Sequence, residues 1–168
     1  MQSIGILKEP DNEKRVCLIP ETVKRIVQDM GIQVYVEERA GFKAGFKDRD
    51  YEYAGAEVLP LDRVYRESES LLSINHLYRG EELEGHRNFI GVFNLLYHHQ
   101  RLGTYQRNGL SVFSLDLVPR TTKAQSMDVL SSMASLSGYK AVIKAAELYS
   151  SVLPMFTTAA GTLRPAKV

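Results

Sequence analysis

The sequence lacks tryptophan, has one cysteine and carries almost no net charge. Lys+Arg 21 against Asp+Glu 20 leaves a formal charge of +1, which gives no reason to expect nucleic acid or an anionic membrane as a partner. Cys17 has no second cysteine to pair with, so an internal disulfide is excluded and a reducing compartment is indicated. Its apolar neighbours predict a buried small side chain rather than a reactive thiol.

Two longer signals are also missing. No uninterrupted apolar run could span a bilayer, and no basic-then-apolar signal segment opens the chain. We therefore expect a cytoplasmic protein that meets a membrane only through a partner. No Gly-x-Gly-x-x-Gly occurs among the 12 glycines, so the sequence contains no cradle for a dinucleotide pyrophosphate.

Adjacent histidines at His98 and His99 do not predict a metal site. Neighbouring side chains point in different directions on a helix or strand, and no cysteine or nearby carboxylate completes a ligand set. We assign no metal ligand and no catalytic acid or base from the sequence.

The first two thirds of the chain alternate short apolar runs with helical patterns. Residues 3–8 form a first strand, Pro20 opens a helix that Gly31 stops, and residues 32–36 alternate as a second strand. A strand, a helix and a strand in this order predict a parallel pair. The polar loop after the first strand contains Arg15, and loops at that edge of a parallel sheet carry ligand groups.

The same alternation continues to Leu117. The expected elements are a short helix at 48–53 capped by Asp48, a weak helix from Val64, strands at 71–75, 89–96 and 110–117, and a helix at 100–108. About five strands alternate with helices. The predicted fold class is therefore α/β, an open, mostly parallel sheet with helices on both faces, Rossmann- or flavodoxin-like.

A long helix should follow this sheet. Pro119 disfavours helix at Val118, Thr121 or Thr122 can cap a new helix, and no proline appears until Pro154. Apolar residues on more than one side predict burial between two bodies. We expect an N-terminal α/β domain at 1–121, a connecting helix at 122–150, and a crossover at 151–168 whose last three residues begin a new strand.

Polar residues form a stripe along the first half of this helix. They recur three or four apart, at Gln125, Asp128, Ser131, Ser132 and Ser135, with Arg120 just before them. Spacing alone leaves two interpretations. The stripe is either a solvated face or internal hydrogen-bond network, or a ligand-facing edge where Gln125 binds a carboxamide and Arg120 supplies charge.

Four segments resemble a known family. Residues 119–132, 138–142, 157–161 and 165–168 are similar to the alpha subunit of proton-translocating NAD(P) transhydrogenase, and more distantly to alanine dehydrogenase. In the transhydrogenase family an arginine, a glutamine, an aspartate and a serine of this segment lie beside the nicotinamide ring of NAD(H). They match Arg120, Gln125, Asp128 and Ser131, which the resemblance therefore implies to be cofactor-binding.

The resemblance also implies a biochemical setting. The chain would be an N-terminal portion of a subunit that transfers hydride between NAD(H) and NADP(H), coupled to proton translocation by a membrane partner. NAD(H) would be held mainly by a dinucleotide-binding domain into which residues 151–168 lead and which this sequence does not contain, and NADP(H) would be held by the beta subunit. A homodimer, peripheral to the inner membrane, is expected, and the isolated chain is expected to be inactive.

Two departures separate the chain from alanine dehydrogenase. That family has a substrate-binding lysine where this sequence has residues 73–76, and a catalytic histidine where it has Asn94. An amide cannot act as acid or base near neutral pH. An arginine matching Arg15 holds the substrate carboxylate there, which makes Arg15 a possible ligand-proximal residue. An alanine dehydrogenase-like oxidoreductase and a non-catalytic dimerisation module remain the alternatives.

Overall fold

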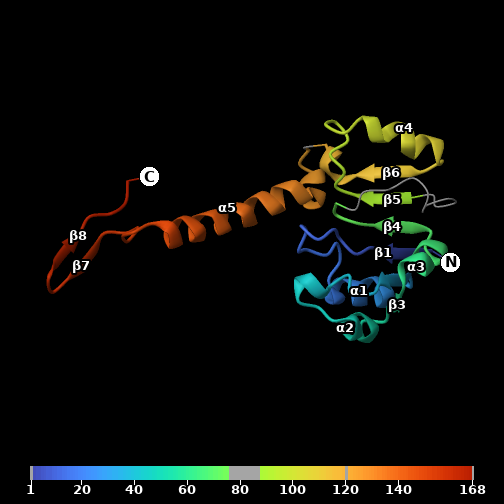
Figure 1. The fold of residues 1–168 in the computed structure, drawn as a ribbon, viewed down its shortest axis with the longest axis horizontal. Helices are drawn as coiled ribbons and strands as arrows, with labels where there is room; N and C mark the ends of the chain where they lie inside the picture. The colour runs from blue at the N-terminus through green and yellow to red at the C-terminus, as the bar shows by residue number, and fades with distance from the viewer. Residues whose placement is uncertain (1, 76–87, 120, 168) are drawn as a thin grey trace. The chain divides into compact units, whose positions relative to one another are not determined.

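The computed structural model describes residues 2–75, 88–119 and 121–167, and the chain divides into two compact units, residues 1–118 and 119–168. The first unit is built on a six-stranded sheet in the order β3-β2-β1-β4-β5-β6 (Figure 1). Its strands are β1 (Ser3–Ile6), β2 (Gln33–Glu37), β3 (Glu57–Leu59), β4 (Ser70–Leu72), β5 (Asn88–Gly91) and β6 (Ser111–Ser114). All five neighbouring pairs are parallel. The strand order reverses between β1 and β4, which is where α/β sheets open a crevice.

Helices connect these strands, and local signals explain their ends. They are α1 (Pro20–Met30), α2 (Asp48–Tyr53), α3 (Leu61–Glu67) and α4 (Gln100–Arg107), with short 3-10 turns η1 (Phe42–Ala44) and η2 (Leu115–Leu117). Pro20 occupies the first turn of α1, where its missing N–H costs nothing. Gly31 ends the helix with φ 64°, a conformation that glycine adopts without strain, and its N–H donates to the Val27 carbonyl.

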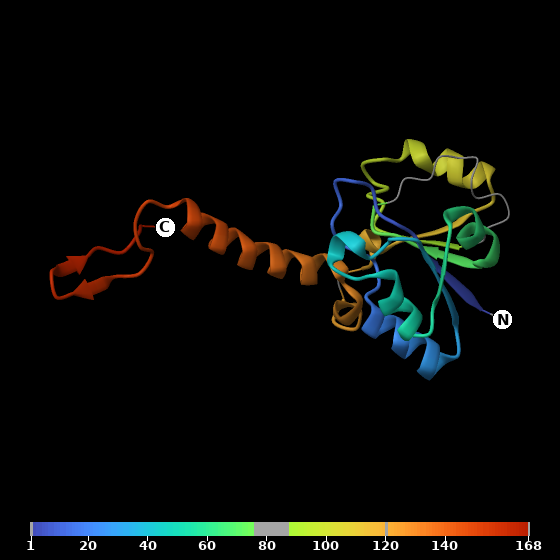
Figure 2. The same ribbon diagram turned by 60° about the horizontal axis from the view of Figure 1, so that its bottom comes forward.

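Two apolar cores cover the two faces of the sheet. On one face Val34 and Val36 of β2 pack with Val23 of α1 and Tyr51 of α2. On the opposite face Leu71 and Phe89 pack with Tyr65 of α3 and Tyr105 of α4. Figure 2 shows α1 (blue) and α4 (yellow) on opposite sides of the strands. The predicted fold class, a parallel sheet with helices on both faces, is confirmed.

Several predicted boundaries in this unit were wrong. The count of five strands omitted β3, whose three residues are too few to show an alternating pattern. The strand expected at 71–75 ends at Leu72, and the one expected at 89–96 ends at Gly91. Asp48 does not cap α2. Its carboxylate accepts the Arg39 N–H at 2.8 Å.

The second unit contains η3 (Ala124–Met127), α5 (Val129–Leu148) and an antiparallel hairpin of β7 (Phe156–Thr158) and β8 (Gly161–Leu163). The prediction of a helix from residue 122 was wrong. The Thr121 hydroxyl accepts the Ala124 N–H at 3.3 Å inside a turn, and the cap of α5 is Asp128. The hairpin was not predicted, and Ala166 lies outside any strand, with its N–H donated to the Leu153 carbonyl at 3.0 Å.

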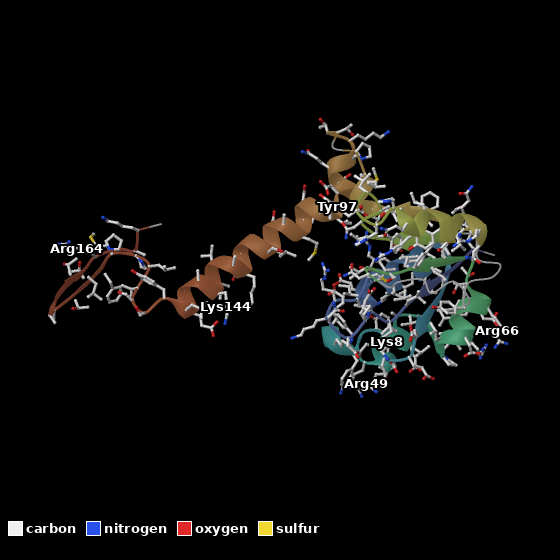
Figure 3. The ribbon with its side chains drawn as sticks, turned by 45° about the horizontal axis from the view of Figure 1, so that its top comes forward. Lys8, Arg49, Arg66, Tyr97, Lys144 and Arg164 are labelled. Atoms are coloured by element: carbon white, nitrogen blue, oxygen red, sulfur yellow. The ribbon has the colours of Figure 1, made fainter. Side chains whose placement is uncertain are left out.

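The helices of the described part include none that is both long and apolar enough to cross a bilayer. α5 is the longest of those described, and it carries charged side chains in its last turns. One of them is Lys144, labelled in Figure 3, whose Nζ lies 2.7 Å from the Glu147 carboxylate.

Candidate functional site

Acidic and polar side chains gather where β1 and β4 end. β1 is followed by a polar loop that contains Glu9, Glu13 and Arg15, and β4 is followed by Ser73 and Asn75. The carboxyl ends of parallel strands lie at the same edge of a sheet. The loops after β1 and β4 leave this edge in opposite directions, because the strand order reverses between the two strands. Arg15, which the sequence analysis identified, lies in the first of these loops.

Glu9 is the buried centre of this edge. Glu9 is 3% exposed, and both oxygens of its carboxylate accept hydrogen bonds. Oε1 accepts the Ile74 N–H at 2.6 Å and the Ser73 hydroxyl at 3.1 Å, and Oε2 accepts the Asn75 N–H at 2.8 Å. A buried carboxylate is tolerated only when it is hydrogen-bonded in this way. Glu9 therefore ties the loop after β1 to the loop after β4.

Arg15 is held by Glu13 rather than left open for a ligand. The guanidinium meets the carboxylate through two nitrogens, Nε to Oε1 at 2.8 Å and Nη2 to Oε2 at 2.6 Å. The Asn75 amide donates to the same Oε2 at 2.8 Å. The hydrogen bond from Arg15 is the main reason that the pKa of Glu13 falls from its ordinary 4.5 to about 2.

The depressed pKa of Glu13 predicts a stability difference that depends on pH. Because the folded state holds the charged carboxylate, its contribution is fully present above pH 4.5 and is lost as pH falls toward 2. We expect Glu13→Gln to lower the unfolding free energy by about 2 kcal/mol at pH 7, allowing for screening of the half-exposed Arg15. Urea titrations of the wild type and of Glu13→Gln should show that the difference in their unfolding free energies becomes smaller from neutral to acidic pH.

The control for this experiment is Asp62→Asn. Asp62 pairs with Arg66 at 2.7 Å, but both side chains are exposed, 62% and 74%. Exposed pairs contribute little to stability, so this variant should match the wild type at every pH. A Glu13→Gln difference that stays constant down to pH 2 would contradict the assigned pKa.

Two further carboxylates accept hydrogen bonds from main-chain N–H groups of a neighbouring loop, as Glu9 does. Glu37, at the end of β2, accepts the N–H of Lys8 at 2.7 Å, and Lys8 is labelled in Figure 3. Asp116 accepts the N–H groups of Phe93 and Asn94 at 3.2 and 3.4 Å, just after β5. Asn94 is exposed and has φ 49°. The loops that leave the sheet at this edge are thus fixed by acidic side chains from adjacent strand ends.

The other candidate residues follow Val118. Arg120 lies outside the described residues. Gln125 is exposed in η3, and its carbonyl accepts the Asp128 N–H at 3.3 Å. Ser131 is brought onto Asp128, with its hydroxyl donating to Oδ2 at 2.6 Å. Asp128 and Ser131 are therefore in contact, and Gln125 is joined to them through the main chain.

The rest of the polar stripe is an internal hydrogen-bond network. The Ser132 hydroxyl donates to the Asp128 carbonyl at 3.3 Å, and the Ser135 hydroxyl donates to the Ser131 carbonyl at 3.2 Å. Hydroxyls that bond one turn back in a helix need no external partner. The structure supports this interpretation for Ser132 and Ser135, while Gln125 belongs to a different element and does not continue the helical stripe.

Asp128 has a structural role that the sequence did not reveal. Its Oδ1 accepts the N–H groups of Leu130 and Ser131 at 2.9 and 3.1 Å, so it caps α5. We expect Asp128→Ala to destabilise the start of α5 by about 1 kcal/mol, and Asp128→Asn to keep the cap. Far-ultraviolet circular dichroism of the two variants during thermal unfolding measures this difference. Equal helix loss in both would show that the charge, not the cap, holds the helix.

Cys17 packs against the apolar core as its neighbours predicted, but it is partly rather than fully buried. Its Sγ lies 3.6 Å from the Leu72 carbonyl oxygen, and burial raises the pKa of the thiol to about 12. Such a thiol is a poor nucleophile at neutral pH. Within the described ranges no three histidine, cysteine, aspartate or glutamate side chains are grouped to hold a metal ion. His98 and His99 are both exposed.

The edge between β1 and β4 does not fit a dinucleotide pyrophosphate. A pyrophosphate needs glycines after the first strand so that the main chain can approach it. The loop at residues 7–19 contains no glycine. The main-chain N–H groups of Ile74 and Asn75, which could face an anion here, are already bonded to Glu9.

Comparisons with known proteins agree on one family. Residues 5–137 match the family model described as Alanine dehydrogenase/PNT, N-terminal domain. The NAD(P) transhydrogenase subunit alpha of Haemophilus influenzae is 36% identical over 169 residues, covering 98% of this chain and 32% of the relative. The solved transhydrogenase of Sinorhizobium meliloti superposes with a TM-score of 0.89 at 37% identity, covering 98% of this chain and 50% of that one.

A solved L-alanine dehydrogenase is more distant. It has a TM-score of 0.76 at 27% identity and covers 87% of this chain and 40% of that chain. The chain thus spans a third to a half of the length of the relatives it matches.

Proposed function

Because the chain belongs to the family of alanine dehydrogenase/PNT N-terminal domains, we propose that it is the N-terminal portion of a transhydrogenase alpha subunit. Its reaction is hydride transfer between NAD(H) and NADP(H), coupled to proton translocation by a membrane partner. The observation that carries the proposal is that the similarity to transhydrogenase alpha subunits covers almost the whole chain. It continues past Val118 and through the segment with Gln125, Asp128 and Ser131.

The two nucleotides are divided between domains in this proposal. NAD(H) is held mainly by a further domain, because the edge between β1 and β4 does not fit its pyrophosphate. NADP(H) is held by the beta subunit. The complex places the alpha subunit on the cytoplasmic side, peripheral to the inner membrane, which agrees with a described part that has no membrane-spanning helix.

Gln125, Asp128, Ser131 and Arg120 orient the nicotinamide ring. The exposed Gln125 amide can both donate to and accept from the ring carboxamide. The bond from Ser131 to Asp128 at 2.6 Å restricts both side chains before any ligand arrives. Hydride passes directly between the nucleotides, so these residues position the ring and exclude water rather than move protons.

Two measurements test this assignment. Calorimetric titration of the 168-residue chain with NADH should show weak binding or none, and low-micromolar affinity would overturn the division between domains. An alpha subunit that includes the nucleotide-binding part, combined with its beta subunit, should reduce NADP⁺ with NADH. Absence of that reaction in a complex that binds both nucleotides would overturn the proposed function.

A homodimer is part of the same proposal. Large apolar side chains on α5 are exposed, among them Leu136, Tyr139 and Val142 at 60–69%. The hairpin also exposes Phe156 and Leu163. An isolated two-stranded hairpin is marginally stable, so both elements need a covering partner. Analytical ultracentrifugation should give the mass of a dimer, and a monomer at all concentrations would contradict it.

Alanine dehydrogenase-like oxidation is the second candidate, because Arg15 lies in the loop that follows β1 at the strand-order reversal, but its guanidinium is paired with the Glu13 carboxylate. The sequence opposes it, because residues 73–76 contain no lysine and Asn94 stands where that family has its histidine, and an amide cannot act as acid or base near neutral pH. The longer subunit, assayed with pyruvate, ammonia and NADH, should show no turnover. Turnover there would favour this candidate.

A further inference from the structure

The donors around Glu9 form a complete receptor for a carboxylate. Two main-chain N–H groups, of Ile74 and Asn75, and the Ser73 hydroxyl converge on two coplanar oxygens at 2.6 to 3.1 Å. Both sides of the contact are buried, with Ser73 2% and Glu9 3% exposed. Converging buried donors of this kind bind anions strongly, because unpaired they would be costly.

The receptor is shaped by the sheet rather than by Glu9. The Ser73 N–H donates to the Ile90 carbonyl at 3.1 Å, and the Val92 N–H donates to the Ile74 carbonyl at 3.1 Å, so the loop continues the pairing of β4 with β5. Gly91 allows the close approach. A Cβ added there would lie 2.2 Å from the Ser73 carbonyl oxygen.

The main chain that carries Glu9 is anchored independently of its carboxylate. The Lys43 ammonium, from η1, donates to the carbonyls of Glu9 and Pro10 at 3.3 and 2.8 Å. It also pairs with Asp11 at 3.0 Å. Removing the Glu9 side chain would therefore leave both walls of the receptor in place and open a space the size of a carboxylate.

We propose that the strand-order reversal of this sheet is a monocarboxylate-binding site that is permanently occupied by the chain's own Glu9. Glu9 acts as an internal ligand. It closes the place where open α/β sheets ordinarily receive a ligand, and it keeps nucleotide phosphates out of this edge. Formate and acetate are the external ligands that match two coplanar oxygens, whereas tetrahedral phosphate does not. Glu9 lies in the first unit, residues 1–118, and the site does not depend on the proposed transhydrogenase function. The two proposals can therefore fail separately.

Chemical rescue of Glu9→Ala in the full chain tests the site. In chloride buffer the thermal midpoint should fall by about 10 °C, because three buried donors lose their acceptor. Sodium formate at constant ionic strength should restore a large part of this loss with a saturable dependence. Sodium phosphate at the same ionic strength should not.

Glu9→Gln is the matched control. It fills the same space but places an amide N–H₂ against main-chain N–H donors, so it should be destabilised and gain nothing from formate. Equal stability of Glu9→Ala and wild type, equal formate effects in all three proteins, or equal rescue by phosphate would each overturn the proposal. If Glu9→Ala does not fold in chloride, the refolded fraction in formate becomes the measurement: recovery supports the site, and no recovery contradicts it.

Discussion

In the proposed transhydrogenase reaction, replacing Gln125 by leucine should slow hydride transfer about 100-fold while changing NADH affinity far less, because a small loss of alignment between two nucleotide rings costs that much in rate. Leucine keeps the size of the side chain but can neither donate to nor accept from the nicotinamide carboxamide. The measurement is single-turnover transfer from NADH to NADP⁺ in the longer subunit combined with its beta subunit. NADH binding to the same variant is titrated separately.

Gln106→Leu provides the control for this change. Gln106 is exposed on α4, in the other unit of the chain, and has no proposed role. Its replacement by leucine is the same chemical change as at Gln125. It should leave both transfer rate and affinity unaltered. An unchanged transfer rate in Gln125→Leu, or a loss explained wholly by weaker NADH binding, would remove Gln125 from the ring-orienting set.

The largest expected effect on stability comes from Phe89→Ala. Phe89 on β5 is 0% exposed in the apolar core, and its ring centroid lies 4.6 Å from that of Phe93 and 6.3 Å from that of Tyr105. Truncation removes buried area and leaves a cavity that neighbouring rings and strands cannot close. We expect the unfolding free energy to fall by about 4 kcal/mol, measured by urea denaturation.

Phe113→Ala is the corresponding control on the adjacent strand. Phe113 lies opposite Ile90 in the pairing of β5 with β6, but its side chain is 55% exposed. The same truncation should cost less than about 1 kcal/mol there. Similar losses in the two variants would mean that Phe113 is covered by a partner in solution.

Elements with their own local signals could be predicted from the sequence. α1 runs from Pro20 to Met30 and stops at Gly31, as the proline and glycine indicate, and α4 at Gln100–Arg107 nearly matches its pattern. The family resemblance read from the segments after Leu117 is confirmed for the domain family. The start of α5 was mispredicted because Thr121 and Asp128 are both good capping residues, and spacing cannot rank them.

The site at the sheet edge was only partly predictable. Arg15 was identified as a polar residue after a first strand, but its partner Glu13 and the anchoring role of Glu9 were missed. The available signal was a charged residue directly after a predicted strand. Glu9 has this position, because it follows residues 3–8. Its partners Ile74 and Asn75 lie about 65 residues away along the chain, so no local pattern could join them.

By itself the sequence determined the α/β class, the family and the positions of most helices, because these depend on short-range periodicity, on proline and glycine, and on a long run of matching residues. Only the tertiary structure decided which strands are neighbours, and hence which carboxylate meets which loop. The reason is physical: parallel pairing brings distant strand ends to one edge, and the hydrogen bonds made there involve main-chain N–H groups that every residue except proline carries. Their partners can be recognised only once the sheet is assembled.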